Sequence, residues 1–235
     1  MGGGGLLAGA AAWHHERAPG TRVQGVEPAG APSMTAALEA GLPVALAHID
    51  GFVDGAAVRR VGDVTFPLVR DLSAGMVTVA EGRVCTEMLD LYQTDGIIAE
   101  PAGALASAVL GHGLRVAPGR TVVCIVSGGN NDVSRYGEIV ERSLIHEGLK
   151  HYFLVDFPQE PGALRGFLDG VLGADDDITL FEYVKKNNRE TGPALVGIEL
   201  ARREDLDPLL ERMDQSRVTI ERVLPDSALF TFLVS

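Results

Sequence analysis

Short apolar stretches alternate with glycine-rich breaks along the first 147 residues of this 235-residue chain. Apolar positions at helical spacing predict helices, and short apolar runs between turn residues predict strands. Helices are expected at 6–16, 33–40, 65–72 and 81–93, with another beginning at 100–104. Strands are expected at 22–27, 75–79 and 121–126, with a loop at 42–62. This alternation indicates an α/β domain with an open sheet, in which ligands bind beyond the carboxyl ends of the strands.

The segment Thr121–Val126 is the strongest strand prediction. It is apolar from Val122 onward, so both of its faces are expected to be buried, as in a parallel sheet covered by helices. The glycine-rich loop 127–131 follows it, and Asn130 in that loop is expected to cap the next helix. A second glycine-rich loop stands directly behind Met1. Both loops are expected at the same edge of the sheet.

The pattern changes near Gly148. Strands are expected at 150–156, 178–186, 194–200 and 219–223, and helices at 163–172 and 204–213. This β-α-β-β-α-β order is the ferredoxin-like plan, and 228–234 is expected to add a strand. The sequence therefore predicts two domains: 1–147 with a partial, mostly parallel open sheet, and 148–235 with a small α+β fold.

Composition excludes several classes of partner. The formal net charge of −12 argues against nucleic acid and anionic membrane surfaces. No run of about 18 apolar residues is present, so no membrane span is expected. Cys85 and Cys124 lie in apolar surroundings, which is typical of reduced core thiols in a cytoplasmic protein.

The loop behind the first residue consists of Gly2, Gly3, Gly4 and Gly5, followed by a run of small residues from Leu6. Glycine adopts positive φ and lets the backbone approach a ligand closely, and N–H groups at a helix start attract anions. One interpretation is a phosphate cradle. The other is a flexible linker or an expression remnant, and the loop by itself leaves both open.

Three motifs in order make the first interpretation specific. GGGGL, EPAGA and SGGN resemble the pyridoxal-phosphate (PLP) enzymes of the tryptophan-synthase β fold, and within them the biosynthetic threonine dehydratases. The segment VDGAAV with the residues that follow it also matches, and the C-terminal part resembles an ACT-like regulatory domain. These segments lie at 2–6, 100–104, 127–130, 53–66 and 148–235.

The resemblance implies that Gly2 to Gly5 and Leu6 hold the PLP phosphate and that Ser127 hydrogen-bonds the pyridine nitrogen. It places Glu100 beside the cofactor, although an acid favoured by the helix dipole is the alternative for this residue. A metal is not expected. Glu27 stands at the position of one cation ligand found in some relatives, but Ser33 replaces an Asp.

The implied activity is that of a threonine ammonia-lyase, which converts L-threonine, or L-serine, to a 2-oxo acid and ammonia in the first step of isoleucine biosynthesis. Isoleucine is the implied allosteric effector, and a cytoplasmic homo-oligomer, a tetramer, the implied assembly. PLP chemistry on amino acids requires a lysine for the Schiff base. The sequence has only Lys150, Lys185 and Lys186, and the family's Ser-Phe-Lys motif is missing. The chain is therefore expected to be an N-terminally truncated enzyme that is inactive alone, so no catalytic residue is assigned.

Two alternatives belong to other classes. The chain could be a regulatory protein that senses an amino acid through its ACT-like domain, near the turn 159–164, while its catalytic half is vestigial. A nucleotide-binding α/β protein is disfavoured, because no acidic residue follows the glycine loop at the distance that ribose recognition requires.

Overall fold

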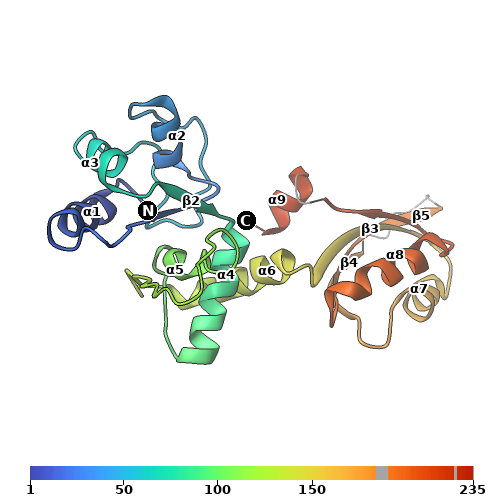
Figure 1. The fold of residues 1–235 in the computed structure, drawn as a ribbon. Coiled ribbons are helices and arrows are strands. Elements are labelled where there is room, and N and C mark those ends of the chain that lie inside the picture. Colours follow the sequence, from blue (N-terminus) through green and yellow to red (C-terminus); the bar gives the residue numbers. More distant parts are fainter. Residues whose placement is uncertain (184–189, 225–226, 235) are drawn as a thin grey trace. The chain divides into compact units, whose positions relative to one another are not determined.

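The computed structural model describes residues 1–183, 190–224 and 227–234. The chain divides into two compact units, Met1–Val140 and Glu141–Ser235 (Figure 1). Each unit has its own sheet and its own apolar core.

A two-stranded parallel sheet lies at the centre of the N-terminal unit. Strand β1 (Gly25–Pro28) pairs with β2 (Met76–Val79), with Gly25 opposite Met76 and Pro28 opposite Val79. The helices are α1 (Gly5–Arg17), α2 (Ser33–Ala40), α3 (Thr65–Leu72), α4 (Glu81–Asp90), α5 (Pro101–Ala108) and the start of α6 (Tyr136–His146). A π-helical turn at Leu91–Asp95 continues α4, and a 3₁₀ turn at Val133–Arg135 precedes α6.

Apolar side chains on both sides of this sheet form two clusters. Helices α1, α2 and α3 gather on one side, where Leu7, Met34 and Val69 are buried (Figure 1). Helices α4 and α5 lie on the other side, where Val84 and Leu105 are buried. The sheet is thus covered on both faces, as the α/β pattern of the sequence predicts.

Several helix bounds agree closely with the sequence pattern. Helices α2 and α3 span 33–40 and 65–72, as predicted. Gly41 ends α2 with a φ of 73° and donates its N–H to the carbonyl of Leu38 at 3.3 Å. A left-handed residue at this position is most easily supplied by glycine, which explains the sharp end of the helix.

The strand predicted at Thr121–Val126 is wrong for this structure. These residues form neither helix nor strand, and most of them are exposed: Val123 is 82% exposed and Ile125 is 52% exposed. β-propensity records how well a side chain fits a packed and paired surface, and no described strand pairs with this segment. Without a neighbouring strand, apolar composition alone does not produce one.

The C-terminal unit has the predicted ferredoxin-like order. Its elements are β3 (Lys150–Pro158), α7 (Ala163–Val171), β4 (Asp177–Tyr183), β5 (Thr191–Glu199), α8 (Leu206–Asp214), β6 (Thr219–Arg222) and α9 (Ala228–Val234). The sheet order is β4-β5-β3-β6, and every pair is antiparallel. A 3₁₀ turn at Arg203–Asp205 leads into α8. The predicted strand 178–186 runs past Tyr183 into positions outside the described residues.

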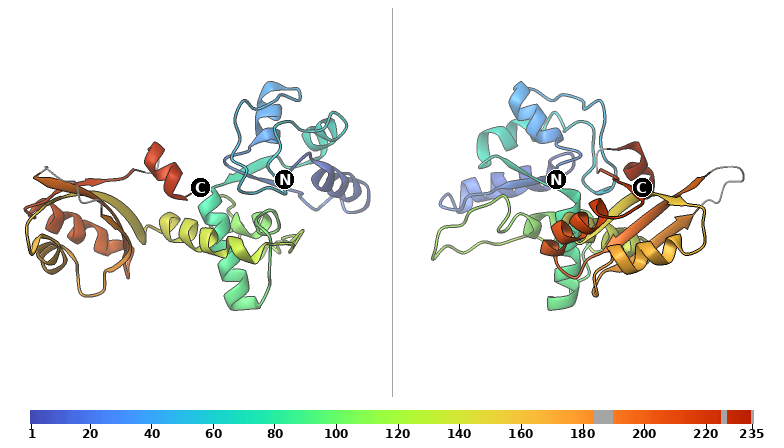
Figure 2. Two further views of the ribbon diagram at one scale, coloured as in Figure 1. Left: turned by 180° about the vertical axis from the view of Figure 1, so that it is seen from behind. Right: turned by 90° about the vertical axis from the view of Figure 1, so that its right-hand side faces the viewer.

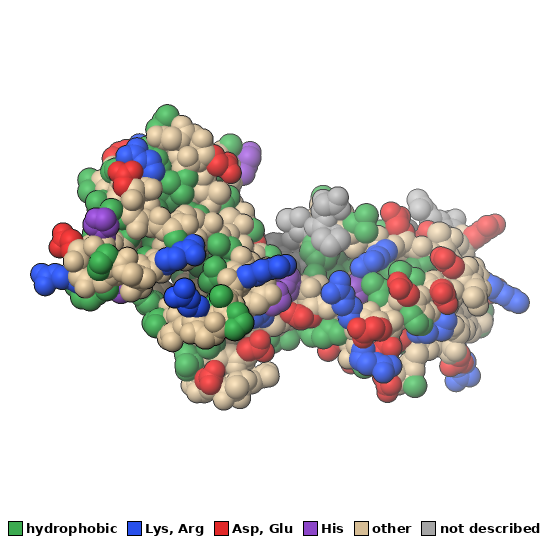
Figure 3. All heavy atoms as spheres, in the orientation of Figure 1, with side chains coloured by type: hydrophobic (Ala, Val, Ile, Leu, Met, Phe, Trp, Pro, Cys, Tyr) green, Lys and Arg blue, Asp and Glu red, His purple; other side chains and the backbone are tan. Residues whose placement is uncertain are grey.

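Every second residue along β3 from Phe153 faces the core of this unit. Phe153, Val155 and Phe157 are buried and pack with residues of α7 and α8, including Phe167 and Leu209. Both helices therefore cover the same face of the sheet (Figures 1 and 2). On the face drawn in Figure 3, acidic and basic side chains are interspersed over this unit.

The expectation of a strand at 228–234 is also wrong, because Ala228–Val234 forms helix α9. A short apolar run does not distinguish a strand from a helix by periodicity alone. In the described ranges, none of the helices combines the length and the apolar character needed to cross a membrane.

Candidate functional site

The glycine loop begins helix α1. Gly4 has a φ of 96° and precedes the first helical residue, Gly5. The first hydrogen bond of the helix runs from Ala8 N–H to the carbonyl of Gly4 at 2.8 Å. The N–H groups of Gly5, Leu6 and Leu7 therefore have no acceptor among the described residues. Three free donors at the positive end of a 13-residue helix form a site suited to an anion.

The loop is held in place by the start of α3. The Thr65 hydroxyl donates to the carbonyl of Gly3 at 2.5 Å, and Gly62 N–H donates to the same carbonyl at 3.2 Å. A Cβ on Gly4 would lie 2.8 Å from Thr65 Oγ1. These contacts require glycine at position 4, both for its positive φ and for its close packing. A free linker would make no such contacts.

The segment around Gly55 lies next to the loop. A Cβ on Gly2 would lie 3.4 Å from the Gly55 carbonyl oxygen. A Cβ on Gly55 would lie 2.9 Å from Ala102 Cβ and 3.6 Å from a carboxylate oxygen of Glu100. The structure therefore brings the glycine loop, the VDGAAV segment and the EPAGA segment to one place.

Glu100 connects this group to the third motif. Its N–H donates to the carbonyl of Gly128 at 3.1 Å, and Gly128 lies directly against its carboxylate. Glu100 is the residue before α5, but its side chain makes no capping hydrogen bond. The carboxylate therefore caps no backbone N–H of α5, and it lies between the glycine segments at 55 and 128.

The two ends of the 127–131 loop make fewer contacts with the rest of the described chain. Ser127 is exposed and makes no hydrogen bond with another described residue. Both amide atoms of Asn131 are buried without a hydrogen-bond partner in the described chain. The expected cap at Asn130 is wrong: the Asp132 carboxylate accepts the N–H of Ser134 at 2.9 Å and begins the turn before α6.

Arg135 is a residue of this region that the sequence pattern did not reveal. Its guanidinium donates to the carbonyl of Phe52 at 2.8 Å and lies 5.0 Å from the centre of the Phe52 ring. It also lies 3.7 Å from the Asp54 carboxylate and 3.9 Å from that of Glu138. Arg135 therefore ties the 52–54 segment to the chain that follows the SGGN loop. Its position just after that loop is the only signal in the sequence.

We expect Arg135→Lys to loosen the 52–55 segment. Lysine keeps the charge but not the planar guanidinium that bonds Phe52 and stacks on its ring. The expected cost is about 1 kcal/mol of unfolding free energy, the value of one hydrogen bond, with faster amide exchange confined to residues 52–58. Hydrogen exchange measured by mass spectrometry checks this. Arg60→Lys, in an exposed ion pair with Asp63, is the matched control and should leave this exchange unchanged; equal effects of the two variants would contradict the role of Arg135.

Glu27 has a structural role in the fold. Its carboxylate is fully buried at the start of α2, where it accepts the N–H groups of Met34 at 2.8 Å and Thr35 at 2.9 Å. It also accepts the Thr35 hydroxyl at 3.0 Å. In the ranges that the structure covers, His, Cys, Asp and Glu side chains form no group of three or more that could hold a metal ion.

The lysines and cysteines are placed as follows. The Lys150 amine, in the C-terminal unit, donates to the Glu141 carboxylate. Lys185 and Lys186 lie outside the described residues. Cys85 is buried and Cys124 is partly buried, and neither forms a disulfide with another described residue. Burial, with the nearby charge of Glu87, raises the pKa of the Cys124 thiol, so it stays protonated at neutral pH.

Two family models match the chain. One, described as pyridoxal-phosphate dependent enzyme, matches residues 1–128. The other, described as the C-terminal regulatory domain of threonine dehydratase, matches residues 141–233.

Curated relatives align with the whole chain. A protein named L-threonine dehydratase biosynthetic IlvA from Mycobacterium tuberculosis is 61% identical over 236 residues, covering 100% of this chain and 55% of the relative. The protein of that name from Bacillus subtilis is 51% identical over 234 residues, covering 100% of this chain and 56% of the relative. The chain thus spans about half the length of the curated relatives it matches.

Solved structures give the same picture of the fold. The processed form of threonine deaminase isoform 2 from Solanum lycopersicum matches with a TM-score of 0.57 and 37% identity, over 62% of this chain and 40% of that one. The crystal structure of a T.th. threonine deaminase matches with a TM-score of 0.53 and 38% identity, over 56% of this chain and 47% of that one.

Proposed function

Because the chain belongs to the family of pyridoxal-phosphate-dependent enzymes and carries the C-terminal regulatory domain of threonine dehydratase, we propose that it forms part of a threonine ammonia-lyase. In this proposal residues 1–147 hold the cofactor and residues 148–235 regulate. The resemblance of the three motifs is confirmed by the family matches, and PLP is the family's cofactor. The observation that carries the proposal is the glycine loop, with its free N–H groups at the start of α1.

The residues of the loop fit the phosphate of PLP. A dianion bound there accepts the N–H groups of Gly5, Leu6 and Leu7 and gains from the helix dipole. The first turn of α1 contains no acidic residue that would repel it. Gly3 and Gly5 have open space where a Cβ would stand, so the backbone is accessible to the ligand. In this proposal Gly2, Gly3, Gly4, Gly5 and Leu6 bind the phosphate.

We assign the part of the site away from the glycine loop to Glu100 and Ser127. We assign the Ser127 hydroxyl to the pyridine nitrogen and place the Glu100 carboxylate beside the cofactor ring. The exposure of Ser127 leaves its hydroxyl accessible to a ligand. The unpartnered amide of Asn131 supports a polar group completing this part of the site, because buried polar atoms are rarely left unpaired.

PLP, when bound, supplies the electron sink for loss of the α-proton and the β-hydroxyl of threonine. The residues of this chain bind its phosphate and orient its ring, but none is a candidate for the Schiff-base lysine. Lys150 is already engaged by Glu141, and no lysine occurs between residues 1 and 149. We therefore expect the 235-residue chain alone to form no 2-oxobutanoate from threonine.

A fusion tests this proposal. The part of the Mycobacterium tuberculosis relative that this chain does not cover is joined to it in frame, and 2-oxobutanoate is measured with L-threonine and with L-serine. The fusion is expected to be active and the chain alone inactive. Activity of the chain alone would contradict the missing lysine. A folded but inactive fusion would favour the amino-acid-sensing protein with a vestigial catalytic half.

We further propose that the C-terminal unit binds isoleucine at the start of α7. A cavity of about 530 Å³ lies there, and its walls include the rings of Phe157, Phe181 and Tyr183 together with Leu168. These side chains suit a branched aliphatic group. The N–H groups of Leu164 and Arg165 in the first turn of α7 and the Arg165 guanidinium suit its carboxylate.

Thermal unfolding with added isoleucine tests this effector site. At about 100 times the dissociation constant, a ligand adds about 2.7 kcal/mol to the unfolding free energy, so the melting temperature should rise clearly. Arg165→Gln should reduce the rise, whereas Arg217→Gln, an exposed arginine outside the cavity, should not. No rise with isoleucine, or an equal loss in both variants, would contradict the proposal.

The assembly and location are part of the same proposal. We expect a homo-oligomer, a tetramer by resemblance, in the cytoplasm, where cysteines outside disulfides, such as Cys85 and Cys124, remain reduced. Light scattering on the purified fusion measures the oligomer directly.

A further inference from the structure

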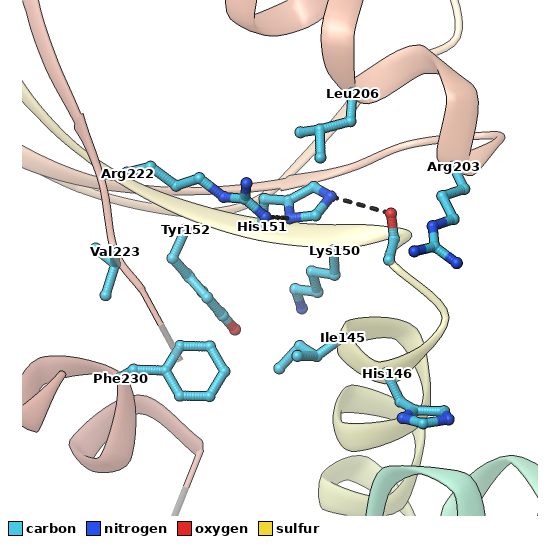
Figure 4. Close-up of a pocket in the computed structure, with 11 residues that line it drawn as sticks. Ile145, His146, Lys150, His151, Tyr152, Arg203, Leu206, Arg222, Val223 and Phe230 are labelled. Atoms are coloured by element: carbon cyan, nitrogen blue, oxygen red, sulfur yellow. Dashed lines mark hydrogen bonds between the residues drawn. The ribbon is translucent and has the colours of Figure 1, made fainter. Parts of the chain in front are cut away.

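A second, smaller cavity lies in the C-terminal unit, away from the start of α7. Its volume is about 200 Å³, or about seven water molecules at ~30 Å³ each. The end of α6, the start of β3, the turn before α8, the end of β6 and helix α9 contribute to its walls (Figure 4). Neither the proposed PLP site nor the isoleucine site includes any of its residues.

One part of the cavity wall is cationic. Arg222 donates to Nδ1 of His151 at 2.9 Å, so the other ring nitrogen of His151 donates to the Gly148 carbonyl at 3.0 Å (Figure 4). His151 is therefore neutral, and burial together with the charge of Arg222 lowers its pKa. Arg222 uses one N–H in this contact and keeps others for a ligand. Arg203 lines the cavity close to Gly148.

Neither arginine forms an ion pair with a carboxylate among the described residues. Nearby arginines do: Arg202 pairs with Asp205 at 3.1 Å, and Arg212 pairs with Asp176 at 2.9 Å. Lys150, the other cation in the wall, is neutralised by Glu141. In a chain with a net charge of −12, two arginines facing one cavity without a carboxylate indicate an anionic ligand.

Another part of the wall is apolar. Ile145, Leu206, Val223 and Phe230 contribute to it, beside His146 and Tyr152, and the ring centroids of Phe230 and Tyr152 lie 6.3 Å apart in an edge-to-face arrangement. These side chains favour an aliphatic group over water. A ligand that satisfies both parts of the wall has a negative charge at one end and a short hydrocarbon chain at the other.

We propose that this cavity binds a short-chain aliphatic carboxylate, with its charge on Arg203 and Arg222 and its chain against Leu206, which lies on the same side of β3 as the two arginines (Figure 4). An amino acid fits less well, because its ammonium group needs an acceptor. The Glu141 carboxylate already accepts Lys150 and the Tyr152 hydroxyl, and the Gly148 carbonyl already accepts His151. An inorganic anion would leave the apolar part of the wall unused.

Butyrate is the probe for this site, and butyramide is its uncharged control. Binding to the 235-residue chain is measured by calorimetry and by thermal unfolding. Butyrate is expected to bind and raise the melting temperature, whereas butyramide is not. Arg222→Gln and Arg203→Gln are each expected to weaken butyrate binding by about tenfold, as loss of a charge-assisted hydrogen bond predicts. Arg202→Gln removes the same charge from the neighbouring residue, outside the cavity, and is expected to leave binding unchanged.

Several results would overturn the proposal. These are no binding of butyrate at tens of millimolar, equal binding of butyramide, and equal weakening by Arg202→Gln. Inorganic phosphate binding as tightly as butyrate would assign the cavity to an inorganic anion instead. Displacement of butyrate by isoleucine would make this cavity the amino-acid site. Arg203 is exposed, so its variant tests the proposal even if Arg222→Gln disturbs the fold.

Discussion

Replacing Gly103 with alanine is expected to destabilise the N-terminal unit and displace the SGGN loop. Gly103 lies in helix α5, where alanine ordinarily stabilises by about 1 kcal/mol. Here a Cβ would clash with the carbonyl oxygen of Gly128, the acceptor of the Glu100 N–H. The expected net loss is about 1–3 kcal/mol, as for other overpacked sites. Because the clash is with backbone, the loop that carries Ser127 should move away from Glu100.

Gly9→Ala is the matched control for this prediction. Gly9 lies inside α1, is exposed, and has no atom within 4 Å of the position of a Cβ. Alanine there should raise the unfolding free energy by about 1 kcal/mol. Urea unfolding of both variants measures whether each substitution raises or lowers the unfolding free energy. Stabilisation by Gly103→Ala would mean that the contact between α5 and the SGGN loop is not made.

Glu27→Gln is expected to have the largest effect outside the proposed cofactor site. The carboxylate accepts three donors at the start of α2 and is fully buried. Glutamine has one acceptor oxygen, and its NH₂ group would face donors from Met34 or Thr35. The expected loss is about 2–4 kcal/mol, because charge-assisted hydrogen bonds are lost and buried donors are left unpaired. That is a large share of the total stability of a typical domain.

Glu39→Gln on the same helix is the control for Glu27. Glu39 is exposed near the end of α2, where a negative charge is not favoured by the helix dipole. Its replacement should change the unfolding free energy by less than about 0.5 kcal/mol. Similar losses in the two variants would contradict the capping role of Glu27.

The sequence predicts most of this fold because local signals agree with the packing. Helix α2 ends at a glycine that adopts positive φ, and α5 begins with proline, so their bounds follow from backbone chemistry. The antiparallel sheet of the C-terminal unit follows from alternating residues such as Phe153 and Val155. All its strands lie within one contiguous segment.

The wrong predictions concern segments whose structure depends on neighbours. Thr121–Val126 has strand composition, but no described strand pairs with it. Ala228–Val234 is apolar except for Thr231, and periodicity does not choose between helix and strand in so short a run. Composition indicates burial in both cases, but tertiary contacts decide the conformation.

Glycines made part of the candidate site predictable, because glycine is needed where backbone segments approach each other closely. Gly2, Gly55 and Gly128 come from three motifs, and the structure brings the segments that carry them together around Glu100. Arg135 could not be predicted, because nothing local indicates that a guanidinium reaches a carbonyl 83 residues earlier in the chain. Lys150 and its partner Glu141 likewise depend on how α6 meets β3.

Comparing PLP with pyridoxal, which lacks only the phosphate, tests the central claim most directly. Pyridoxal closes into an internal hemiacetal through its 5′-hydroxyl and PLP does not, so the corresponding alcohols, pyridoxine 5′-phosphate and pyridoxine, are titrated alongside as a pair that forms no Schiff base with surface amines. Calorimetric titration of the 235-residue chain should show PLP binding at least about tenfold more tightly than pyridoxal, as charge-assisted hydrogen bonds to the phosphate predict. Gly4→Ala, which strains the cradle, should abolish this difference. Equal affinities for PLP and pyridoxal in the unmodified chain would contradict a phosphate site at Gly2 to Leu6.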